Sequence, residues 1–252
     1  MKQSGRTVLI TGGTSGIGLE LARRFLRKEN QVIVTGRDEA KLAAAERELS
    51  GVRAIRCDVS DPDEIADLHG RMLREFPALD VIVNNAGIMR NIKLAVGRSL
   101  EEVAREIDTN LSGPIRMVQQ FLPHLLLKPE AMIVNVTSGL AFVPFPAAPI
   151  YSAAKAGLRA YTRALRAQLA ASTVRVVELA PPGTDTSLFH DGFEEETKNI
   201  RPMPLGKLAD QAMAGIMSGK TEIRPGLSSA LMLLSRLAPE FALRQLAKAS
   251  GY

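Results

Sequence analysis

Tyr151 and Lys155 lie four residues apart in PIYSAAKAGLRAY, a segment rich in alanine. Alanine favours a helix, and a helix places positions i and i+4 on the same face. The phenol and the ammonium group should therefore lie side by side, and their small neighbours leave room for a flat molecule. Because a nearby cation stabilises a phenolate, we expect Lys155 to lower the pKa of Tyr151, which would suit proton transfer. The alternative is a surface helix with an extended lysine.

A glycine-rich turn in VLITGGTSGIGLELARRF separates a strand pattern from an amphipathic helix pattern. Glycines let such a turn tighten and let a pyrophosphate approach backbone N–H groups at the start of the helix. Thr11, Gly12, Gly16 and Gly18 form the spacing T-G-x-x-x-G-x-G. Glycines also serve ordinary turns, but the position directly after the first strand favours a nucleotide site.

The elements that must position these residues alternate along the chain. The predicted strands are the aliphatic runs TVLITG, QVIVTG, RAIRCD, DVIVNN, MIVNVTS and VRVVELAPP, separated by segments with helical periodicity. This alternation predicts an α/β fold with a doubly wound, mostly parallel, Rossmann-like sheet. We expect a single domain over residues 1–252, with a polar helical or mobile insertion at 190–199, a short strand TEIRPG and an apolar helical tail.

Composition argues against several classes of protein. The net charge of +5 comes from 32 basic and 27 acidic residues spread along the chain, so no nucleic-acid partner is expected. The single cysteine, Cys57, cannot form an internal disulfide and should be buried and inert. The three histidines lie far apart, and no metal site is expected. The chain begins without a signal-peptide pattern and has no membrane-length apolar run, so we expect a cytoplasmic protein.

Further motifs follow the glycine turn, namely NNAG at 84–87, Asn110, Ser138 and the Tyr151/Lys155 pair. In this order and spacing they resemble the short-chain dehydrogenase/reductase (SDR) family, over nearly the whole chain. VTSGLAF, and APP followed by DT, resemble its DltE-like subgroup. The resemblance implies an enzyme that transfers a hydride between a nicotinamide cofactor and a carbonyl or alcohol.

The resemblance also implies a catalytic tetrad. Tyr151 is the general acid/base at the substrate oxygen, and Lys155 holds the nicotinamide ribose and, with the oxidised nicotinamide, favours the phenolate. Ser138 hydrogen-bonds the substrate oxygen and stabilises its developing negative charge. Asn110 holds a water that relays protons to Lys155. Taken alone, Ser138 and Asn110 could each be a helix cap.

Residues around the glycine turn and after later strands are implied to bind the cofactor. They are Gly12, Thr14, Ser15, Gly16, Ile17, Gly18, Arg37, Asp58, Val59, Asn85, Ala86, Gly87, Tyr151, Lys155, Pro181, Thr184 and Thr186. Gly36 stands where family members that use NAD carry an acid, and Arg37 offers a planar guanidinium for a 2′-phosphate, which favours NADP(H). Asp38 is expected to cap the next helix; if it turned inward, NAD would be accepted.

The segment ELAPPGTDTSLF departs from the family pattern, because Thr184 stands where a valine is usual. Thr184 can keep a contact made by its backbone, and Thr186 matches the family threonine near the carboxamide. Gly183 is expected to add mobility to a substrate lid over residues 187–204.

Apolar residues near this lid suggest a pocket for a lipophilic carbonyl compound. They are Phe142, Val143, Phe145, Leu188, Phe189 and Phe193. The alternative is that they pack the lid onto its own domain. His190 is expected to be exposed.

The tail LSSALMLLSRLAPEFALRQLAK has apolar residues at helical spacing with basic residues among them. It could cover the core, pack against a partner subunit, or lie on a membrane surface. The resemblance implies a homodimer or homotetramer paired through the helices that carry Asn110 and Tyr151.

These observations predict an NADP(H)-dependent oxidoreductase that interconverts a small-molecule carbonyl and a secondary alcohol. The competing hypothesis is a non-catalytic nucleotide sensor or scaffold on the same fold. Such a protein needs the glycine turn but can lose the tyrosine or the lysine, and this chain has both.

Overall fold

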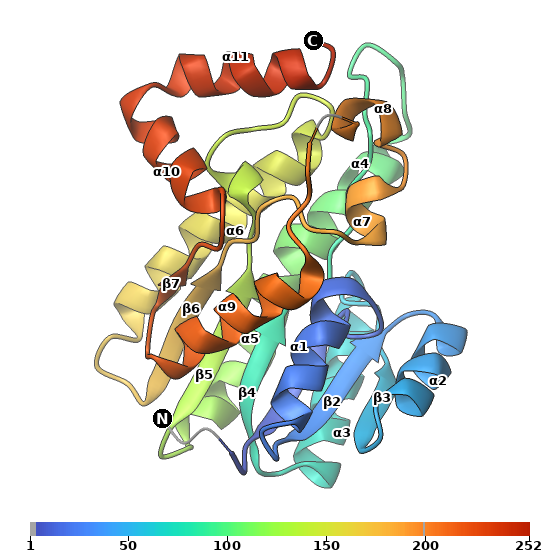
Figure 1. Ribbon diagram of the computed structural model, residues 1–252. Coiled ribbons are helices and arrows are strands. Elements are labelled where there is room, and N and C mark those ends of the chain that lie inside the picture. The colour runs from blue at the N-terminus through green and yellow to red at the C-terminus, as the bar shows by residue number, and fades with distance from the viewer. Residues whose placement is uncertain (1–3, 199) are drawn as a thin grey trace.

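The computed structural model describes residues 4–198 and 200–252 and confirms the predicted α/β fold (Figure 1). Within these residues one parallel sheet has seven strands in the order β3-β2-β1-β4-β5-β6-β7. The strands are β1 (Thr7–Thr11), β2 (Gln31–Gly36), β3 (Val52–Arg56), β4 (Leu79–Asn84), β5 (Ala131–Val136), β6 (Val174–Leu179) and β7 (Glu222–Ile223). The predicted strand TEIRPG is therefore reduced to two residues.

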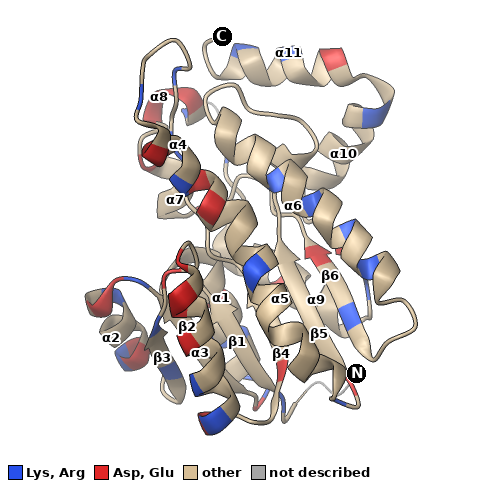
Figure 2. Cartoon of the chain, turned by 180° about the vertical axis from the view of Figure 1, so that it is seen from behind, with Lys and Arg blue, Asp and Glu red and all other residues tan. Residues whose placement is uncertain are grey.

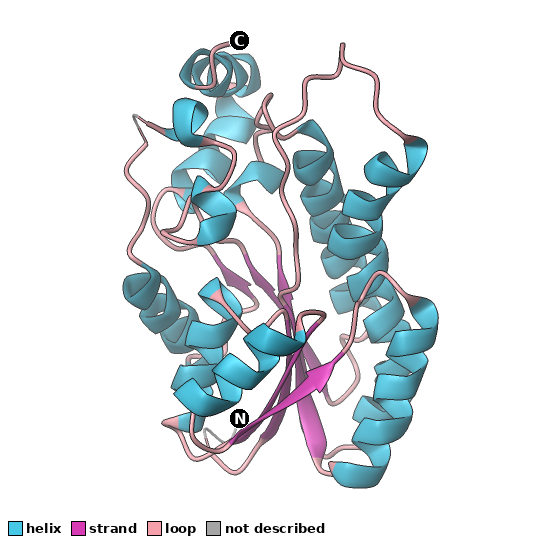
Figure 3. Cartoon of the chain, turned by 90° about the vertical axis from the view of Figure 1, so that its right-hand side faces the viewer, coloured by secondary structure: helices cyan, strands magenta, loops and turns pink. Residues whose placement is uncertain are grey.

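Helices cover both faces of the sheet, as Figure 3 shows. One face carries α1 (Gly16–Leu26), α2 (Glu39–Glu48) and α9 (Leu205–Met217), and the other carries α3 (Pro62–Glu75), α5 (Gly113–Leu126) and α6 (Pro149–Gln168). Successive strand residues point to opposite faces, so Val8 and Ile10 pack in one core and Leu9 in the other. The strands are apolar on both sides for this reason.

Strand order places the predicted motifs together. β1 pairs with β2 on one side and with β4 on the other. A crevice forms at the carboxyl ends of the strands where the direction of winding reverses in this way. The glycine turn follows β1 and NNAG spans the end of β4, so both motifs border this crevice.

Further helices lie beyond the carboxyl ends of the strands. They are α4 (Leu100–Ile107), the π-helix η1 (Asp108–Ser112), the 3₁₀-helix η2 (Gly139–Ala141), α7 (Ser187–His190), α8 (Glu194–Thr197), α10 (Ser228–Leu237) and α11 (Pro239–Ala249). The predicted insertion at 190–199 is helical in α8, while Asn199 lies outside the described residues. His190 is exposed, as predicted.

The C-terminal tail forms two helices because Pro239 cannot continue α10 and instead begins α11. Figure 1 shows both helices turned back over the carboxyl ends of the strands. None of the helices in the described ranges is long and apolar enough to cross a membrane.

Charged residues are interspersed on α2 and α3, while α6 carries basic residues only (Figure 2). Some of the arginines of α6 lie close to acidic side chains of the sheet. Arg166, for example, lies 3.3 Å from Glu222 of β7 and donates to the carbonyl oxygen of Val176 at 3.0 Å. The basic face of α6 is thus tied to the edge of the sheet.

Candidate active site

A cavity of about 1150 Å³ opens at the carboxyl ends of the strands, between the glycine turn and the C-terminal helices. Most of the predicted site residues line it. They are Gly12, Thr14, Ser15, Gly16, Ile17, Arg37, Asp58, Val59, Asn85, Ala86, Gly87, Ser138, Tyr151, Lys155, Pro181, Thr184 and Thr186. Gly18 and Asn110 lie behind the lining and support it. No group of three or more His, Cys, Asp or Glu residues that could hold a metal ion occurs within the described ranges.

The glycine turn brings backbone close to backbone. Gly12 and Gly16 have φ angles of +61° and +51°, a left-handed conformation that favours glycine. A Cβ on Gly12 would lie 2.7 Å from the Cα of Ala86, and a Cβ on Gly18 would overlap the carbonyl oxygen of Gly12. The turn therefore presents the start of α1 to the cavity without side chains in between, which fits a pyrophosphate group.

Asn85 joins this turn to the end of β4. Its side-chain amide donates to the carbonyl oxygens of Thr11 and Gly12, both at 3.0 Å. The hydroxyl of Thr11 accepts in return from the backbone N–H groups of Asn85 and Ala86, both at 3.1 Å. The shape of the crevice thus depends on the hydrogen bonds of Asn85 as well as on the glycines.

Asn110 is fully buried in the π-helix η1, a type of element that often marks functional sites. Its side chain donates to the carbonyl oxygen of Ile88 at 2.7 Å and accepts from the Ile88 N–H at 3.1 Å. A Cβ on Gly87 would lie 2.9 Å from the Asn110 Oδ1. Asn110 therefore anchors the loop that follows NNAG and is not a helix cap. Its role in holding a water stays a prediction.

Ser138, Tyr151 and Lys155 meet at one wall of the cavity. Ser138 follows β5, and the other two lie on α6, which confirms the predicted helix. The Lys155 Nζ lies 5.7 Å from the centroid of the Tyr151 ring, and the Ser138 side chain is near enough to the Tyr151 phenol to lower its pKa. Ser138 also caps η2 by accepting from the Leu140 N–H at 3.1 Å. The cap hypothesis and the active-site hypothesis for Ser138 are therefore compatible.

Burial dominates the protonation of this pair. It raises the pKa of Tyr151 to about 12, although the neighbouring Ser138 side chain lowers it. Burial also lowers the pKa of Lys155 to about 8, and its Nζ donates to the carbonyl oxygen of Val136 at 2.9 Å. In the chain by itself, loss of hydration therefore penalises the phenolate and sets the direction of the Tyr151 pKa. The lowering expected from Lys155 together with the oxidised nicotinamide stays a prediction.

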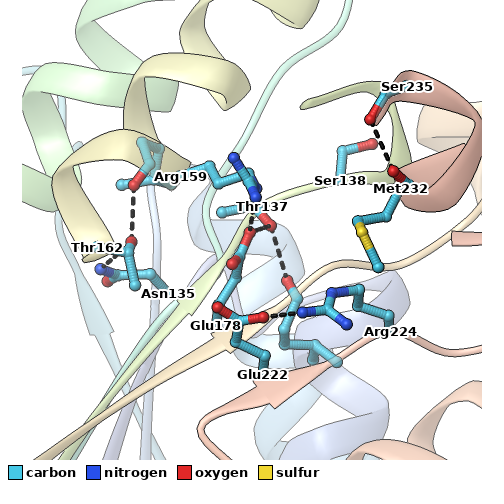
Figure 4. Close-up of polar contacts among 12 residues, drawn as sticks. Asn135, Thr137, Ser138, Arg159, Thr162, Glu178, Glu222, Arg224, Met232 and Ser235 are labelled. Atoms are coloured by element: carbon cyan, nitrogen blue, oxygen red, sulfur yellow. Dashed lines mark hydrogen bonds and ion pairs between the residues drawn. The ribbon is translucent and has the colours of Figure 1, made fainter. Parts of the chain in front are cut away.

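A buried carboxylate supports the strand end that carries Ser138 (Figure 4). Glu178 of β6 is 1% exposed and accepts a hydrogen bond from the Thr137 hydroxyl at 2.9 Å. The Arg159 Nε of α6 lies 3.8 Å from the same carboxylate oxygen. Sequence reasoning missed this support, and the available signal was a glutamate inside the apolar run VRVVEL.

Arg37 and Asp58 lie at the opposite end of the cavity. The Arg37 side chain is 51% exposed, and its nearest guanidinium nitrogen is 4.0 Å from the Asp58 carboxylate. Burial raises the pKa of Asp58, but hydrogen bonds from Ser60 and the charge of Arg37 outweigh burial, so the pKa is lowered. A half-exposed guanidinium at this distance remains able to bind another anion.

Asp38 caps α2, as predicted, by accepting from the Lys41 N–H at 3.0 Å. Gly36 occupies the position where family members that use NAD are expected to carry an acidic residue. A Cβ on Gly36 would lie 3.0 Å from the Thr14 methyl group, so this position leaves little space for a side chain. Lys41 lines the cavity together with Arg37. Lys41 was not predicted to line the cavity, although its position three residues after the cap Asp38 places it in the first turn of α2, near Arg37.

Cys57 also lines the cavity, but it is 3% exposed and burial raises the pKa of its thiol to about 12. A thiol with so high a pKa is a poor nucleophile. The predicted burial of Cys57 is confirmed, and its inertness stays a prediction that the raised pKa supports.

The segment after β6 folds back on itself at the rim of the cavity. The Thr184 hydroxyl donates to the carbonyl oxygen of Pro182 at 2.9 Å, and the Thr186 hydroxyl donates to that of Thr184 at 3.2 Å. A Cβ on Gly183 would lie 2.7 Å from the ring of Phe189. Glycine is required there for close packing, and its predicted effect on mobility stays untested.

The apolar residues predicted for the pocket divide into two groups. Phe145, Leu188 and Phe189 line the cavity, whereas Phe142, Val143 and Phe193 do not. Phe193 is fully buried, and its ring centroid lies 6.3 Å from that of Phe145. Phe193 therefore packs the lid onto its own domain. Some of the predicted apolar residues thus line the cavity, and others pack the lid.

The C-terminal helices add an apolar wall that sequence reasoning did not assign to the site. Leu231 and Leu234 of α10 and Leu246 of α11 line the cavity. The tail thus packs on its own chain, the first of its three predicted roles. Leu237 and Phe241 are exposed on the outer side, so the partner and membrane hypotheses stay predictions for that side.

Comparison with known proteins decides the family. The model of the short chain dehydrogenase family matches residues 6–197. The chain belongs to this family. It is 42% identical over 224 residues to the uncharacterized oxidoreductase DltE of Bacillus subtilis, a match that covers 88% of this chain and 89% of DltE. This similarity confirms the predicted resemblance to the DltE-like subgroup and supports an oxidoreductase.

Solved structures of the family share the fold. A short-chain dehydrogenase from Sphingobium yanoikuyae in complex with NADPH has a TM-score of 0.82 and 27% identity, covering 96% of this chain and 95% of that chain. A 3-ketoacyl-(acyl-carrier-protein) reductase from Brucella melitensis complexed with NADH has a TM-score of 0.78 and 28% identity, covering 87% and 96%. Short-chain dehydrogenases of this fold thus bind either nicotinamide dinucleotide.

Proposed function

We propose that this short-chain dehydrogenase uses NADP(H) to interconvert a carbonyl and a secondary alcohol, as one catalytic domain spanning the chain. The observation that carries the proposal is the position of Ser138, Tyr151 and Lys155 on one wall of a cavity that also contains the glycine turn and Arg37. The bound nicotinamide would supply or accept the hydride.

The side chains of the chain itself account for the proton. In reduction Tyr151 would donate its hydroxyl proton to the carbonyl oxygen, and in oxidation its phenolate would remove the alcohol proton. A pKa of about 12 keeps Tyr151 protonated, the form that reduction needs. The Ser138 hydroxyl would donate to the same substrate oxygen as negative charge develops there. Lys155 would hold the ribose hydroxyls.

Charges at the far end of the cavity favour NADP(H) over NAD(H). Arg37 is half exposed, and Lys41 lines the same region. The acid that would select NAD is replaced by Gly36, and Asp38 is engaged as a helix cap. Asp58 lies 4.0 Å from Arg37, but the half-exposed Arg37 guanidinium and Lys41 together still offer donors and positive charge that suit a 2′-phosphate.

Apolar side chains around the catalytic end favour a lipophilic substrate. Phe145, Leu188 and Phe189 approach from the lid side, and Leu231 and Leu234 from α10. Burying an alkyl or aromatic group of the substrate among them would stabilise binding by about 25 cal/mol per Å² of apolar surface removed from water. Assembly as a homodimer or homotetramer, and a cytoplasmic location, stay predictions.

The test is NADPH oxidation, followed by absorbance, with a panel of aliphatic and aromatic ketones and aldehydes. Tyr151→Phe should lower kcat by about 10²–10⁴-fold and leave NADPH affinity unchanged, since only the acid is lost. Tyr161→Phe, on the same helix but outside the cavity, should remain active. Equal activity of Tyr151→Phe and the unmodified protein would refute the proposal. NADPH binding without turnover of any compound would favour the sensor hypothesis.

A further inference from the structure

Ser138 begins a short turn that has little regular structure of its own. In this turn the N–H of Ala141 donates to the carbonyl oxygen of Ser138 at 3.0 Å. The N–H of Phe142 donates to the carbonyl oxygen of Gly139 at 3.1 Å. The hydrogen bonds of a 3₁₀ turn have poor geometry, so they hold such a turn weakly. The position of the Ser138 hydroxyl therefore depends on contacts from outside the turn.

Glu178 of β6 holds the residue directly before this turn. Its carboxylate accepts from the Thr137 hydroxyl at 2.9 Å, and the residue is 1% exposed. The second carboxylate oxygen has no hydrogen-bond partner within the described ranges. A buried carboxylate of this kind is destabilising unless a cation lies near it.

Arg159 of α6 is such a cation, and it also contacts the residue directly after the turn. Its Nε lies 3.8 Å from the Glu178 carboxylate (Figure 4) and has no hydrogen-bond partner among the described residues, so this attraction is ionic. Its guanidinium carbon lies 4.8 Å from the centroid of the Phe142 ring, a distance at which an arginine is attracted to an aromatic ring. Arg159 and Glu178 together therefore contact Thr137 and Phe142, the two residues that flank the Ser138 turn.

The helix that supplies this contact also carries Tyr151 and Lys155. Tyr151, Lys155 and Arg159 follow one another at intervals of four residues and lie along one side of α6. Helix α6 packs against η2, whereas neither Arg159 nor Glu178 lines the cavity. Because residues 151–159 form one continuous helix, the contact at Arg159 fixes the Ser138 turn relative to the Tyr151 phenol.

Arg166, two turns further along α6, forms an ion pair of the same kind at a different place. It lies 3.3 Å from Glu222 of β7. It also donates to the carbonyl oxygens of Val176 and Thr221, so its contacts are with β6 and the segment around β7. Arg166 is therefore a matched comparison for Arg159, because it shares the helix and the type of contact but holds another part of the chain.

We propose that Arg159 and Glu178 are positioning residues that hold the Ser138 hydroxyl at a fixed distance from Tyr151, so that both groups meet the same substrate oxygen. This inference rests on the proposed function of Ser138 and Tyr151. A donor stabilises negative charge on the substrate oxygen only from hydrogen-bond distance. A displacement of about 1 Å can lower the rate about 10²-fold. The pair thus acts on the reaction without contacting substrate or cofactor.

The first experiment measures kcat for Arg159→Met in two backgrounds. Alone, this variant should lower kcat by about 10–100-fold and leave NADPH affinity unchanged. Ser138→Ala should lower kcat by about 10²–10³-fold, and adding Arg159→Met to it should lower kcat by less than about threefold further, because the hydroxyl that Arg159 positions is gone. Arg166→Met should leave kcat unchanged in both backgrounds. An equal loss from Arg159→Met in the two backgrounds would overturn the inference.

A double variant separates positioning from stability. Arg159→Met leaves the buried Glu178 without its cation and should lower Tm by about 5–10 °C. Arg159→Met combined with Glu178→Met removes both charges and should return Tm to within about 3 °C of the unmodified protein. Its kcat should nevertheless remain about 10–100-fold low, since the turn still lacks its outer contacts. Recovery of kcat together with Tm would contradict the proposed role.

Amide hydrogen exchange of the turn measures positioning without cofactor or substrate. Exchange at residues 139–142 should be about tenfold faster or more in Arg159→Met and in the double variant, and unchanged in Arg166→Met. Faster exchange in Arg159→Met, with no turnover of any compound by the unmodified protein, would refute the proposed function alone. Turnover by the unmodified protein, with unchanged exchange in Arg159→Met, would refute the inference alone.

Discussion

Replacing Lys155 by methionine should stabilise the protein while abolishing its activity. Lys155 is buried, and burial lowers its pKa from 10.5 to about 8. A pKa change of one unit corresponds to about 1.4 kcal/mol, so the charged lysine costs about 3 kcal/mol of folding free energy. Loss of the hydrogen bond to the Val136 carbonyl oxygen offsets about 1 kcal/mol of the gain. The expected net gain near pH 7 is about 2 kcal/mol.

The sign of the pH dependence follows from the lowered pKa of Lys155. Below about pH 8 the lysine is charged in both the folded and the unfolded chain, and the penalty is fully present. Between about pH 8 and pH 10.5 the unfolded chain binds the proton and the folded chain does not, so stability rises with pH. The advantage of Lys155→Met should therefore fall below about 1 kcal/mol near pH 9.5.

Urea unfolding followed by circular dichroism at the two pH values measures this difference. In thermal unfolding the gain near pH 7 should raise Tm by about 4–8 °C. Lys220→Met, at an exposed lysine outside the cavity, should leave stability unchanged at both pH values. A less stable Lys155→Met near pH 7, or a gain that persists undiminished near pH 9.5, would refute the reasoning.

Two further variants test the cofactor end of the cavity. Gly18→Ala should lower the free energy of unfolding by about 1–3 kcal/mol and remove most NADPH affinity, because the added Cβ would overlap the Gly12 carbonyl oxygen. Gly97→Ala is the control, since a Cβ on Gly97 meets open space. Thermal unfolding measures the stability of both variants, and titration calorimetry measures their NADPH affinity. Equal stability of the two variants would contradict this account of the turn. Arg37→Ala should weaken NADPH binding about tenfold or more and leave NADH binding nearly unchanged in titration calorimetry. An equal loss for both cofactors would show that Arg37 does not recognise the 2′-phosphate.

Local patterns were sufficient where a short stretch of chain carries its own cause. Asp38 was predicted as a cap and is one, because an N-cap needs only the next three residues. The helix around Tyr151 is likewise predicted by the local run of alanines. The glycine turn before α1 is predicted by its glycines, and Gly12 there has the left-handed φ that favours glycine. The parallel sheet follows from the alternation of strands and helices.

Predictions that depended on distant residues were less secure. Burial raises the pKa of Tyr151 in the chain by itself, a contribution that the lysine four residues away gave no reason to expect. The support given by Glu178 was not predicted, since a glutamate in the sequence is expected on the surface unless a partner is known. The three leucines of α10 and α11 that line the cavity could not be assigned from the sequence, because the path of the tail over the strand ends depends on the tertiary structure.

The amino-acid sequence by itself determined the order of strands and helices, the glycine turn and the identity of the side chains at 110, 138, 151 and 155. These depend on residue types and on spacings of a few residues. Only the tertiary structure decided which groups lose water, which side chains meet across the sheet and which helices close the cavity. Hydration and long-range contact are properties of the packed chain, so no local pattern encodes them.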